Sequence, residues 1–523
     1  MNVKKIIKLM VGVFALGAVL PGQTAAAMGG RVIDEKTNVI VVLVDDQGFG
    51  QLPVYSDDYP DEMLLLTKTT ERYRCDEQKA KAAAKVCMPN LQKLADNGVT
   101  FMNAHVTSPV CGPSRAALLT GRYQQRFGAY DNCDLVKAGL PVSETLLPEL
   151  FQRAGYRTAM IGKWHVGKRT KTPLPLQTND YHKNSIAHCI PEHHPLNRGF
   201  DYYFGFNSSG TTYYNSPSLF RGFENVKAEG YATDQFTDEA VQFIEESGAD
   251  PFFVYLAYSA PHIPLEDAAP EKHQRFDTGN PEVDNYYATL AAVDDGLGKI
   301  CQTLEKRGEL ENTLIFYLSD NGAVIDSPQP MNGPFRGNKG MFRHGGMHVP
   351  MIAHWPAKLK PSRHTPRVAS IDVLPTTLAA AGIGLPENLD GVDLVPTLGT
   401  NEDAHEAIFW AGPDIMHWSE DNKAFWRDYW EYVTERTDDA PSSPHVAGEA
   451  SWAVQKGRWL LRCNEVTGAV ELFDVCADPG ERSEVSAAHS EIVDALRADY
   501  KVWAAGLAKP LAWSEEQYER LVK

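Results

Sequence analysis

Two pairs of oxygen-bearing side chains follow apolar, β-branched runs of the sequence. Asp45 and Asp46 follow the run 38–44, and Asp320 and Asn321 follow the run 314–318 after one serine. Three carboxylates and an amide oxygen are hard ligands, which suit Ca²⁺ or Mg²⁺ better than zinc. Either pair alone is more simply explained by turn or helix-cap chemistry. Together, at two run ends, they are compatible with a site for calcium or magnesium.

A different chemistry is indicated at Cys111, which opens the segment Cys-Gly-Pro-Ser-Arg at 111–115 and an apolar helical stretch at 116–119. Proline suits the first turn of a helix, so Cys111 is predicted at a helix N-terminus, where the dipole and free N–H groups favour anions. Arg115 lies one turn further along the same face. A disulfide or a buried cysteine at a helix start is the plain alternative.

Two basic windows stand out in a chain whose net charge is −18. Residues 157–171 contain five Lys/Arg and no acid, and residues 331–350 contain three Lys/Arg, two His and no acid. The windows indicate an anion site or a solvated charged face. The overall acidity argues against a general nucleic-acid or anionic-membrane binder.

These residues need a scaffold, and the sequence alternates short apolar runs with helical patterns. Runs at 38–44, 157–161, 252–258 and 314–318 each end in a polar cluster, while helical periodicity covers 88–97, 142–154, 233–246, 286–307 and 368–381. Alternation of this kind predicts an α/β fold with a large, mostly parallel sheet flanked by helices. Ligands of such sheets bind beyond the carboxyl ends of the strands, so the polar clusters are expected to converge.

The region from 396 to 523 differs from the rest. It is rich in Trp and charge, then alternates over 452–463 and 469–475 around a turn near 467–468, and ends in a helical pattern at about 487–507. We predict a catalytic domain over 28–395 and a smaller C-terminal α+β subdomain over 396–523 that carries an antiparallel sheet.

The motifs resemble those of the type I, formylglycine-dependent sulfatases of the alkaline phosphatase superfamily. The resemblance rests on segments in family order over nearly the whole chain: 45–46, 111–115 with 119–122, 162–167, 261–264, 319–322, 339–340, and 472–474 with 478–481. Any one of these motifs is weak alone, but coincidence of all in order is very improbable.

The resemblance implies an alkaline-phosphatase-like fold and specific roles. Cys111 would be oxidised to formylglycine by a maturation enzyme; one hydroxyl of its hydrate would attack sulfur to form a covalent sulfo-enzyme, and the other would re-form the aldehyde and expel sulfate. Cys111 would also contact the metal held by the four oxygen ligands. Arg115 would hold the hydrate, Lys163 and Lys339 would bind sulfate, His262 would protonate the leaving oxygen, and His165 would assist deprotonation of the hydrate.

One departure from the family pattern follows Lys339. Many relatives have an acidic residue before the paired glycines and an arginine after them, whereas this chain has His344 and His348. Whether these histidines contact substrate stays open. Two alternatives also stay open: a phosphonate monoester or phosphodiester hydrolase of the same superfamily, and a non-catalytic sulfated-glycan binding protein with unmodified Cys111.

The N-terminus has the order of a signal peptide. Lysines 4, 5 and 8 precede an apolar run at 9–20, and three alanines at 25–27 offer a cleavage site. The run is too short to span a bilayer, and no later stretch is long enough. We predict a signal peptide at 1–27 and an exported protein of the bacterial periplasm or the extracellular space.

Export suggests disulfides among the eight cysteines, and the spacing favours the pairs Cys75–Cys87, Cys133–Cys189 and Cys463–Cys476. Cys301 lies on an apolar helical stripe and is expected in the core. Export and the tryptophans 410, 418, 426 and 430 suggest a sulfated polysaccharide or oligosaccharide substrate, although a core role explains such tryptophans as well. A histidine-rich run at 182, 188, 193 and 194 is predicted either to line the sulfate pocket or to cover a sheet edge.

Overall fold

The computed structural model describes residues 36–65, 69–173, 185–210, 212–227, 229–263, 265, 267–325, 327–414, 450–512 and 515–523. Residues Lys36–Lys523 form one compact unit. The predicted signal peptide lies outside the described residues. Within them, no helix has the length and apolar character that crossing a bilayer requires.

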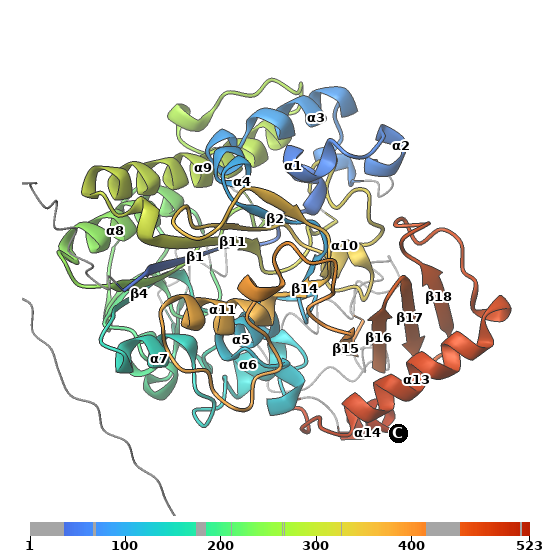
Figure 1. The fold of residues 1–523 in the computed structure, drawn as a ribbon. Coiled ribbons are helices and arrows are strands. Elements are labelled where there is room, and N and C mark those ends of the chain that lie inside the picture. The colour runs from blue at the N-terminus through green and yellow to red at the C-terminus, as the bar shows by residue number, and fades with distance from the viewer. Residues whose placement is uncertain are drawn as a thin grey trace, which may run out of the picture. The chain divides into compact units, whose positions relative to one another are not determined.

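The centre of the described chain is a ten-stranded sheet (Figure 1). Its strands, in spatial order, are β13 (Ser362–His364), β2 (Val99–Phe101), β12 (Met351–His354), β11 (Thr313–Ser319), β1 (Asn38–Val44), β10 (Phe252–Ala257), β4 (Arg157–Lys163), β7 (Tyr202–Phe206), β8 (Phe220–Arg221) and β9 (Glu224–Asn225). The central neighbours β11, β1, β10, β4 and β7 pair in parallel. The predicted α/β class with a large, mostly parallel sheet is therefore confirmed.

Helices cover both faces of this sheet (Figure 1). On one face, Ile40 and Val42 of β1 share a core with α3 (Glu77–Val86), α4 (Pro89–Asp96), α8 (Ala232–Glu246) and α9 (Pro281–Arg307). On the other face, Val39 and Val41 share a core with α5 (Cys111–Thr120), α7 (Leu147–Arg153) and α11 (Val373–Ala380). Side chains alternate along a strand, so a continuous β-branched run such as β1 supplies apolar groups to both layers.

Shorter elements complete this part of the chain. They are α1 (Pro53–Ser56), α2 (Asp61–Leu64), α6 (Asn132–Lys137) and α10 (His344–Met347), the pair β3 (Ala104–His105) and β14 (Val368–Ala369), and the hairpin of β5 (Arg169–Pro173) and β6 (Ser185–Cys189).

Two predicted helices begin later than their apolar pattern. The pattern at 142–154 becomes α7 only from Leu147, because Pro148 occupies the first turn, where a missing N–H costs nothing. The pattern at 368–381 starts as strand β14, and the helix α11 begins at Val373. There the carboxylate of Asp372 accepts from the N–H of Ala369 at 2.7 Å, which favours a turn over a longer helix.

The C-terminal region contains a four-stranded antiparallel sheet, β15 (Ala407–Pro413), β16 (Ala450–Lys456), β17 (Trp459–Asn464) and β18 (Val470–Asp474), with α13 (Ser490–Ala504) and α14 (Glu515–Val522) (Figure 1). The antiparallel sheet is confirmed, but the single strand predicted over 452–463 is wrong. The chain turns at Gly457, whose φ of 54° is easy for glycine, and so forms two strands. The domain boundary at 395/396 stays a prediction.

The three predicted disulfides are absent, since all eight cysteines are free thiols. Helix α3 separates Cys75 from Cys87 by about 15 Å, far beyond the reach of a disulfide. The register of β17 and β18 pairs Cys463 with Val470 at the turn, whereas Cys476 follows the opposite end of the hairpin, about 13 Å away along the strand. Cys301 packs, partly buried, against the core of α9 as expected.

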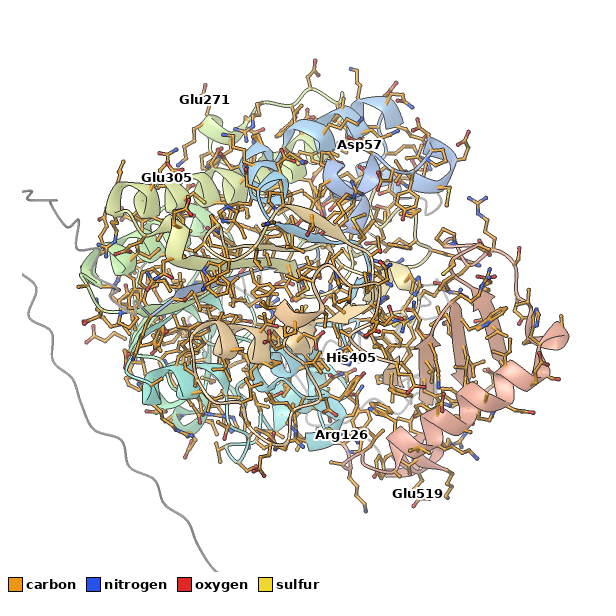
Figure 2. All side chains as sticks on the ribbon, viewed as in Figure 1. Asp57, Arg126, Glu271, Glu305, His405 and Glu519 are labelled. Carbon is orange, nitrogen blue, oxygen red and sulfur yellow. The ribbon has the colours of Figure 1, made fainter. Side chains whose placement is uncertain are left out.

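The surface carries much of the acidic excess. Asp57, Glu271, Glu305 and Glu519 are exposed and lie at the periphery of the molecule (Figure 2). Other charged side chains are buried, and several of these lie at the carboxyl edge of the large sheet.

Candidate active site

The predicted polar clusters meet at the carboxyl ends of the central strands. The backbone continues the strand pairing past those ends: the N–H of Asp320 donates to the carbonyl of Val44 at 3.0 Å, and the N–H of Asp45 donates to Ala260 at 3.0 Å. Asp46 has a φ of 70°, the left-handed region that a non-glycine residue rarely adopts. This turn follows β1 directly, so the two adjacent carboxylates are held by strand pairing and a tight turn.

Cys111 begins α5 beside these carboxylates. Its side chain is buried, with Sγ 3.4 Å from Oδ1 of Asp45 and 3.0 Å from Nζ of Lys339. Burial, reinforced by the charge of Asp45, raises the pKa of the Cys111 thiol far above its usual value. The cysteine itself is therefore a poor nucleophile here, because a thiolate is disfavoured.

Each of the two adjacent carboxylates has cationic neighbours. Lys163 and Arg115 contact Asp45, the latter at 3.3 Å from Nη2. Lys339 lies 2.7 Å from Oδ1 of Asp46. Burial alone would raise the pKa of Asp45, but the charges of Lys163, His262 and Arg115 hold it well below its usual range. The Asp45 carboxylate therefore stays ionised.

Asp320 faces Arg115 more than it faces the centre of the cluster. Its Oδ2 accepts from Nε of Arg115 at 2.9 Å and lies 2.8 Å from Nη2 as an ion pair, and its Oδ1 accepts from the N–H of Asp46 at 3.2 Å. Burial and the charge of Asp45 raise the pKa of Asp320 to about 7. Arg115 also donates to the carbonyl of Lys163 at 2.7 Å, so its contacts order the site rather than make a hydrogen bond to Cys111.

The two predicted catalytic histidines differ in environment. Nε2 of His262 lies 3.5 Å from Oδ2 of Asp46, and burial together with the charge of Lys339 lowers the pKa of His262 to about 4. His165 has a φ of 58°, and its buried Nδ1 has no hydrogen-bond partner among the described residues. Burial and the charge of Lys163 lower the pKa of His165 well below its usual value, which keeps the imidazole neutral.

The oxygen donors of this site fit a hard cation, although the four side chains whose ligand atoms lie closest together include a thiol and an imidazole and do not include the predicted ligand Asp320. Ligand atoms of Asp45, Asp46, Cys111 and His262 lie within 4.8 Å of one another. Asn321 donates from Nδ2 to Asp46 at 2.6 Å, while its buried Oδ1 has no hydrogen-bond partner in the described part of the chain. An orphaned buried amide oxygen beside two carboxylates is an incomplete oxygen site, which a cation would complete.

Residues that sequence reasoning missed hold this site in place. Tyr213 donates from Oη to the carbonyls of Ser259 and His262 at 3.1 and 2.9 Å. Asn332 bonds both backbone groups of Ala323, at 2.8 and 3.0 Å, and the carbonyl of Gly337, thereby joining the loops that follow Asn321 and precede Lys339. Neither belongs to a recognised motif, and their partners are backbone groups distant in sequence.

Glu481 is a third residue that positions the site. It belongs to the motif 478–481, so the sequence did mark it. Its buried carboxylate accepts from the N–H of His344 at 2.9 Å and from Nη1 of Arg343 at 2.7 Å. It thus attaches the segment after Lys339 to the turn that follows β18.

The histidines that depart from the family pattern lie away from this cluster. Nε2 of His344 hydrogen-bonds Oε1 of Gln455 at 2.8 Å, and Nε2 of His348 bonds the carbonyl of Met102 at 3.0 Å. Both rings pack on His105. Their contacts are structural, and the same is true of Trp410, which is fully buried.

The histidine-rich run at 182, 188, 193 and 194 lies only partly within the described residues. His193 accepts from the N–H of Lys168 at 2.9 Å, and His194 accepts from the N–H of Leu196 at 3.2 Å. Both are buried, so they support the fold rather than line a pocket. His188 is half-buried on β6 and packs on Phe220, whereas position 182 lies outside the described residues.

The chain also matches known protein families. The family model described as Sulfatase matches residues 37–383, which is more than half of the chain. The chain belongs to the sulfatase family. It is a sulfuric ester hydrolase of the alkaline phosphatase superfamily. A second model, described as the C-terminal region of N-sulphoglucosamine sulphohydrolase, matches residues 337–502.

Individual sulfatases resemble it over most of their length. An uncharacterized sulfatase of Escherichia coli K12, YdeN, is 39% identical over 93% of this chain and 89% of its own. Human N-acetylgalactosamine-6-sulfatase is 30% identical over 90% of this chain and 85% of its own. The crystal structure of Ps i-CgsB in complex with a neocarrahexaose superposes with a TM-score of 0.70 at 26% identity, over 93% of this chain and 96% of that one.

Proposed function

We propose that this sulfatase hydrolyses sulfate esters of a polysaccharide or oligosaccharide with formylglycine derived from Cys111 and bound calcium. The observation that carries the proposal is the position of Cys111 at the start of α5, with Lys339 at 3.0 Å and Asp45 at 3.4 Å from Sγ. A raised thiol pKa makes the unmodified cysteine unsuited to attack, whereas hydrated formylglycine supplies an oxygen nucleophile together with a second hydroxyl for release of sulfate.

The residues that would hold the metal are Asp45, Asp46, Asp320 and Asn321, with position 111 as a further contact. Calcium is proposed because carboxylates and an amide oxygen suffice for a hard cation. When bound, it supplies positive charge that neutralises sulfate oxygens and lowers the pKa of the attacking hydroxyl. Magnesium is the alternative cation for the same ligands.

Cationic side chains of the chain itself would bind the sulfate group. Lys163 pairs with Asp45 and Lys339 pairs with Asp46. Each ammonium has donors beyond the one its carboxylate accepts, so both can point hydrogen bonds at a bound anion. Arg115, which pairs with Asp320 and Asp45 and donates to the carbonyl of Lys163, orders these groups instead.

The two histidines would move protons. His165 is neutral and has a free Nδ1, which suits a base that accepts the proton of the hydrate. His262 would protonate the leaving oxygen. A bound sulfate adds negative charge beside His262 and thereby raises its pKa from the low value that burial and Lys339 impose, so the acid form becomes available when substrate is present.

The substrate class is supported by the relatives. One relative is named N-acetylgalactosamine-6-sulfatase, after a sulfated sugar. Another was crystallised in complex with a neocarrahexaose. The side chains around Cys111 are charged or polar, and such surroundings suit a hydrated sugar better than an apolar steroid or aryl group. We further propose that the enzyme is exported, so that it meets fragments of polymers outside the cytoplasm, after Cys111 has been converted by a maturation enzyme.

The deciding experiment compares matched sulfate and phosphate esters, then a panel of sulfated oligosaccharides of defined linkage with an aryl sulfate. We expect a higher kcat/KM for sulfate than for phosphate esters, and for a sulfated saccharide than for the aryl sulfate. A preference for phosphonate or phosphodiester substrates would assign the rival chemistry of the superfamily. A wide preference for the aryl sulfate would refute the saccharide substrate but not the sulfatase chemistry.

A further inference from the structure

Three buried histidines, His105, His344 and His348, pack together beside the segment that follows Lys339, and we call them the histidine cluster. The ring centroid of His105 lies 5.3 Å from that of His344 and 4.7 Å from that of His348, and the latter two are 5.7 Å apart. Phe335 stacks on His348 at 4.1 Å, so an apolar ring covers part of the cluster. Nothing in the reaction proposed above uses these side chains.

Hydrogen bonds determine where each ring carries its proton. Each Nε2 contacts one oxygen at 2.8–3.0 Å: Oδ1 of Asn103, Oε1 of Gln455 and the carbonyl of Met102, for His105, His344 and His348 in that order. All three partners are acceptors, so each ring donates from Nε2. The three Nδ1 atoms are buried and have no hydrogen-bond partner among the described residues. A second proton on any of these rings would therefore lack both an acceptor and water.

The charges around the cluster also oppose a second proton. Among the described residues, the charged side chains that act on the rings are Arg367, which opposes protonation of His105 and His344, and Glu481, which favours that of His344. Burial, together with the neighbouring histidines, lowers the pKa of His105 and His348 well below its usual value. Burial also lowers the pKa of His344, so all three rings are neutral in the folded protein.

Helix α10, whose first residue belongs to the cluster, closes the loop that carries Lys339. The N–H of Gly345 donates to the carbonyl of Arg336 at 2.8 Å, and this bond joins the two ends of the loop. The N–H of Gly322, in the loop after β11, donates to the carbonyl of Gly346 at 3.1 Å. A displacement of α10 would therefore disturb both loops of the reaction centre.

Strand β3 holds α10 on the side of the cluster. The N–H of Val106, just after β3, donates to the carbonyl of Met347 at 2.8 Å, and the N–H of Val349, just after α10, donates to the carbonyl of Ala104 at 3.0 Å. His105 lies between these two bonds in the sequence, and its ring contacts both other histidines. Packing of the three rings thus accompanies the pairing of β3 with α10.

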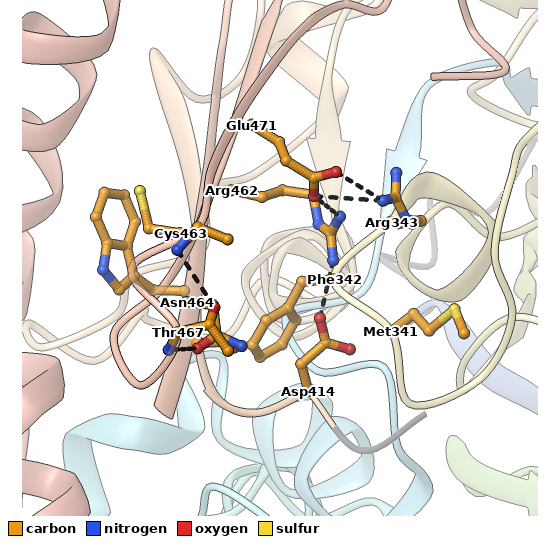
Figure 3. A pocket seen from close by; sticks show the side chains of 12 residues that line it. Met341, Phe342, Arg343, Asp414, Arg462, Cys463, Asn464, Thr467 and Glu471 are labelled. Atoms are coloured by element: carbon orange, nitrogen blue, oxygen red, sulfur yellow. Dashed lines mark hydrogen bonds and ion pairs between the residues drawn. The ribbon is translucent and has the colours of Figure 1, made fainter. Parts of the chain in front are cut away.

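A charged anchor holds the residues just before α10. Arg343 lies 3.2 Å from Glu471 of β18, as Figure 3 shows, and 2.7 Å from Glu481. This anchor contains no histidine. Histidine is the side chain whose ordinary pKa lies between pH 5 and 8, so acidification within this range acts on the contact between α10 and β3.

We propose that the histidine cluster, while neutral, holds α10 against β3 and thereby positions the loop that carries Lys339, and that acid loosens this contact. The inference goes beyond the proposed reaction, because it concerns how the site is kept closed and not which ester is hydrolysed.

The direction of the pH effect follows from where the protons bind. A ring that takes a second proton only in the open segment contributes stability that is complete above the unfolded pKa of about 6.5 and is lost as pH falls below it. Each ring that becomes solvated on opening should therefore raise the opening equilibrium constant about tenfold at pH 5.5 relative to pH 8.

Amide hydrogen exchange measures the opening directly and needs no turnover. The amides of Val106 and Val349 bond the two segments together, so their protection reports the contact. After correction for the intrinsic exchange rate, we expect their protection to fall about 100-fold or more from pH 8 to pH 5.5 in the wild-type protein. In His348→Gln, whose amide nitrogen can still donate to the carbonyl of Met102, this fall should be about tenfold smaller.

His194→Gln is the matched control. His194 is also buried, packs on Tyr203 of β7, and has a pKa that burial lowers to about 4. Because it contacts a different part of the sheet, its replacement should leave the pH dependence at Val106 and Val349 as in the wild-type protein. His344→Gln repeats the test if His348→Gln has a lowered Tm. Equal protection at the two pH values in the wild-type protein, an undiminished fall in the cluster variant, or the same reduction in His194→Gln overturns the inference.

Discussion

The reaction centre is assembled from buried ion pairs: Lys163 with Asp45, Lys339 with Asp46, and Arg115 with Asp320. Removing such charges from water costs several kcal/mol per ion, and the attraction between partners barely repays it. A cluster of this kind is therefore a poor way to stabilise a fold. Its presence at the carboxyl edge of the sheet is explained by ligand binding, which uses both the acidic and the basic members.

At Cys111 we expect substitution by alanine to reduce turnover by roughly three orders of magnitude or more, because the covalent route needs the side chain at this position. Folding should change little, since only a small buried group is removed. Steady-state kinetics and thermal unfolding measure the two effects. Cys301→Ala on α9 is the control and should retain activity. A Cys111→Ala enzyme with most of its activity would refute the mechanism, and a peptide mass at 111 shows directly whether the thiol has become an aldehyde.

At the metal ligands we expect about one calcium ion per chain, and its loss or weakening in Asp45→Asn, Asp320→Asn and Asn321→Ala. Calcium should stabilise the folded wild-type enzyme by about 2.7 kcal/mol at a free concentration of 100 times its Kd, and should therefore raise its Tm. The rise in Tm should be smaller in the variants. Elemental analysis and calcium titration of Tm give the measurements. Stoichiometric zinc, or an active enzyme without metal, would contradict the assignment.

At the scale of elements, the site depends on loops that are anchored from outside. The segment after Lys339 carries no regular structure until α10, and Glu481 holds it from the turn after β18. The His262 loop is held by Tyr213, and helices α8 and α9 are joined through His273. A few buried polar side chains thereby replace the rigidity that a helix or strand would give.

We expect Glu481→Ala to lower the free energy of unfolding by about 3 kcal/mol, because it removes one of the two carboxylates that pair with the mostly buried Arg343 and leaves the N–H of His344 without its acceptor. Activity should fall as well, since the same segment positions Lys339. Urea unfolding with an activity assay checks both. Glu491→Ala, at an exposed position of α13, should stay within about 0.5 kcal/mol. A loss no larger than that of the control would show that Glu481 does not anchor the segment.

The stability that the His273 contacts between α8 and α9 contribute should depend on pH. His273 is buried between Asp234 at 2.9 Å and Asp295 at 2.6 Å; burial opposes its protonation, but these carboxylates raise the pKa of His273 above its usual value. A raised folded-state pKa gives stability that is complete below the unfolded pKa of about 6.5 and is lost as pH rises through the folded pKa. His273→Gln should therefore cost more stability at pH 5.5 than at pH 9.

Urea unfolding at the two pH values measures this difference. In an Asp234→Asn, Asp295→Asn background, the cost of His273→Gln should no longer change with pH. A cost that is the same at both pH values in the wild-type background would refute the charged contact.

The elements that sequence reasoning predicted best are those whose patterns are local. The run at 38–44 is strand β1 as predicted, and the stretch after Cys111 is helix α5, because burial on both faces and a proline in the first turn leave clear local signals. The break at Gly457 was missed since alternation continues through it. The disulfides were misplaced because spacing along the chain does not reveal that a helix or a strand separates two cysteines.

The site was predicted through its charged members, which have motifs, and not through their supports. Asp46 and Lys339 could be named from the sequence, whereas Tyr213 and Asn332 could not. Their partners are carbonyl and N–H groups, which every residue possesses, so no residue type marks the contact. Only the path of the backbone reveals it.

At the scale of the whole molecule, export remains to be tested. We expect the protein expressed in a bacterium to accumulate outside the cytoplasm with its N-terminus near residue 28, because residues 1–27 have the order of a cleavable signal. N-terminal sequencing of the periplasmic fraction checks this, and a variant without residues 2–27 should remain in the cytoplasm. Full-length protein in the membrane fraction would indicate an uncleaved anchor instead.

The hydrogen bonds that join distant parts of the site have a consequence for how the enzyme unfolds. The N–H of Asp46 bonds Asp320, and Lys339 bonds Cys111, across 274 and 228 positions of the chain, so no short segment contains the site. The ends of β1 and β11, which carry the carboxylates, belong to the central sheet and thus to the most cooperative part of the fold, whereas the loop that carries Lys339 can open locally. The amide hydrogens of Asp45, Asp46 and Asp320 should then exchange with deuterium only as fast as the whole molecule unfolds. The carboxylates of the site should therefore stay in place until the sheet itself unfolds, even when the loop that carries Lys339 has opened and activity is already lost.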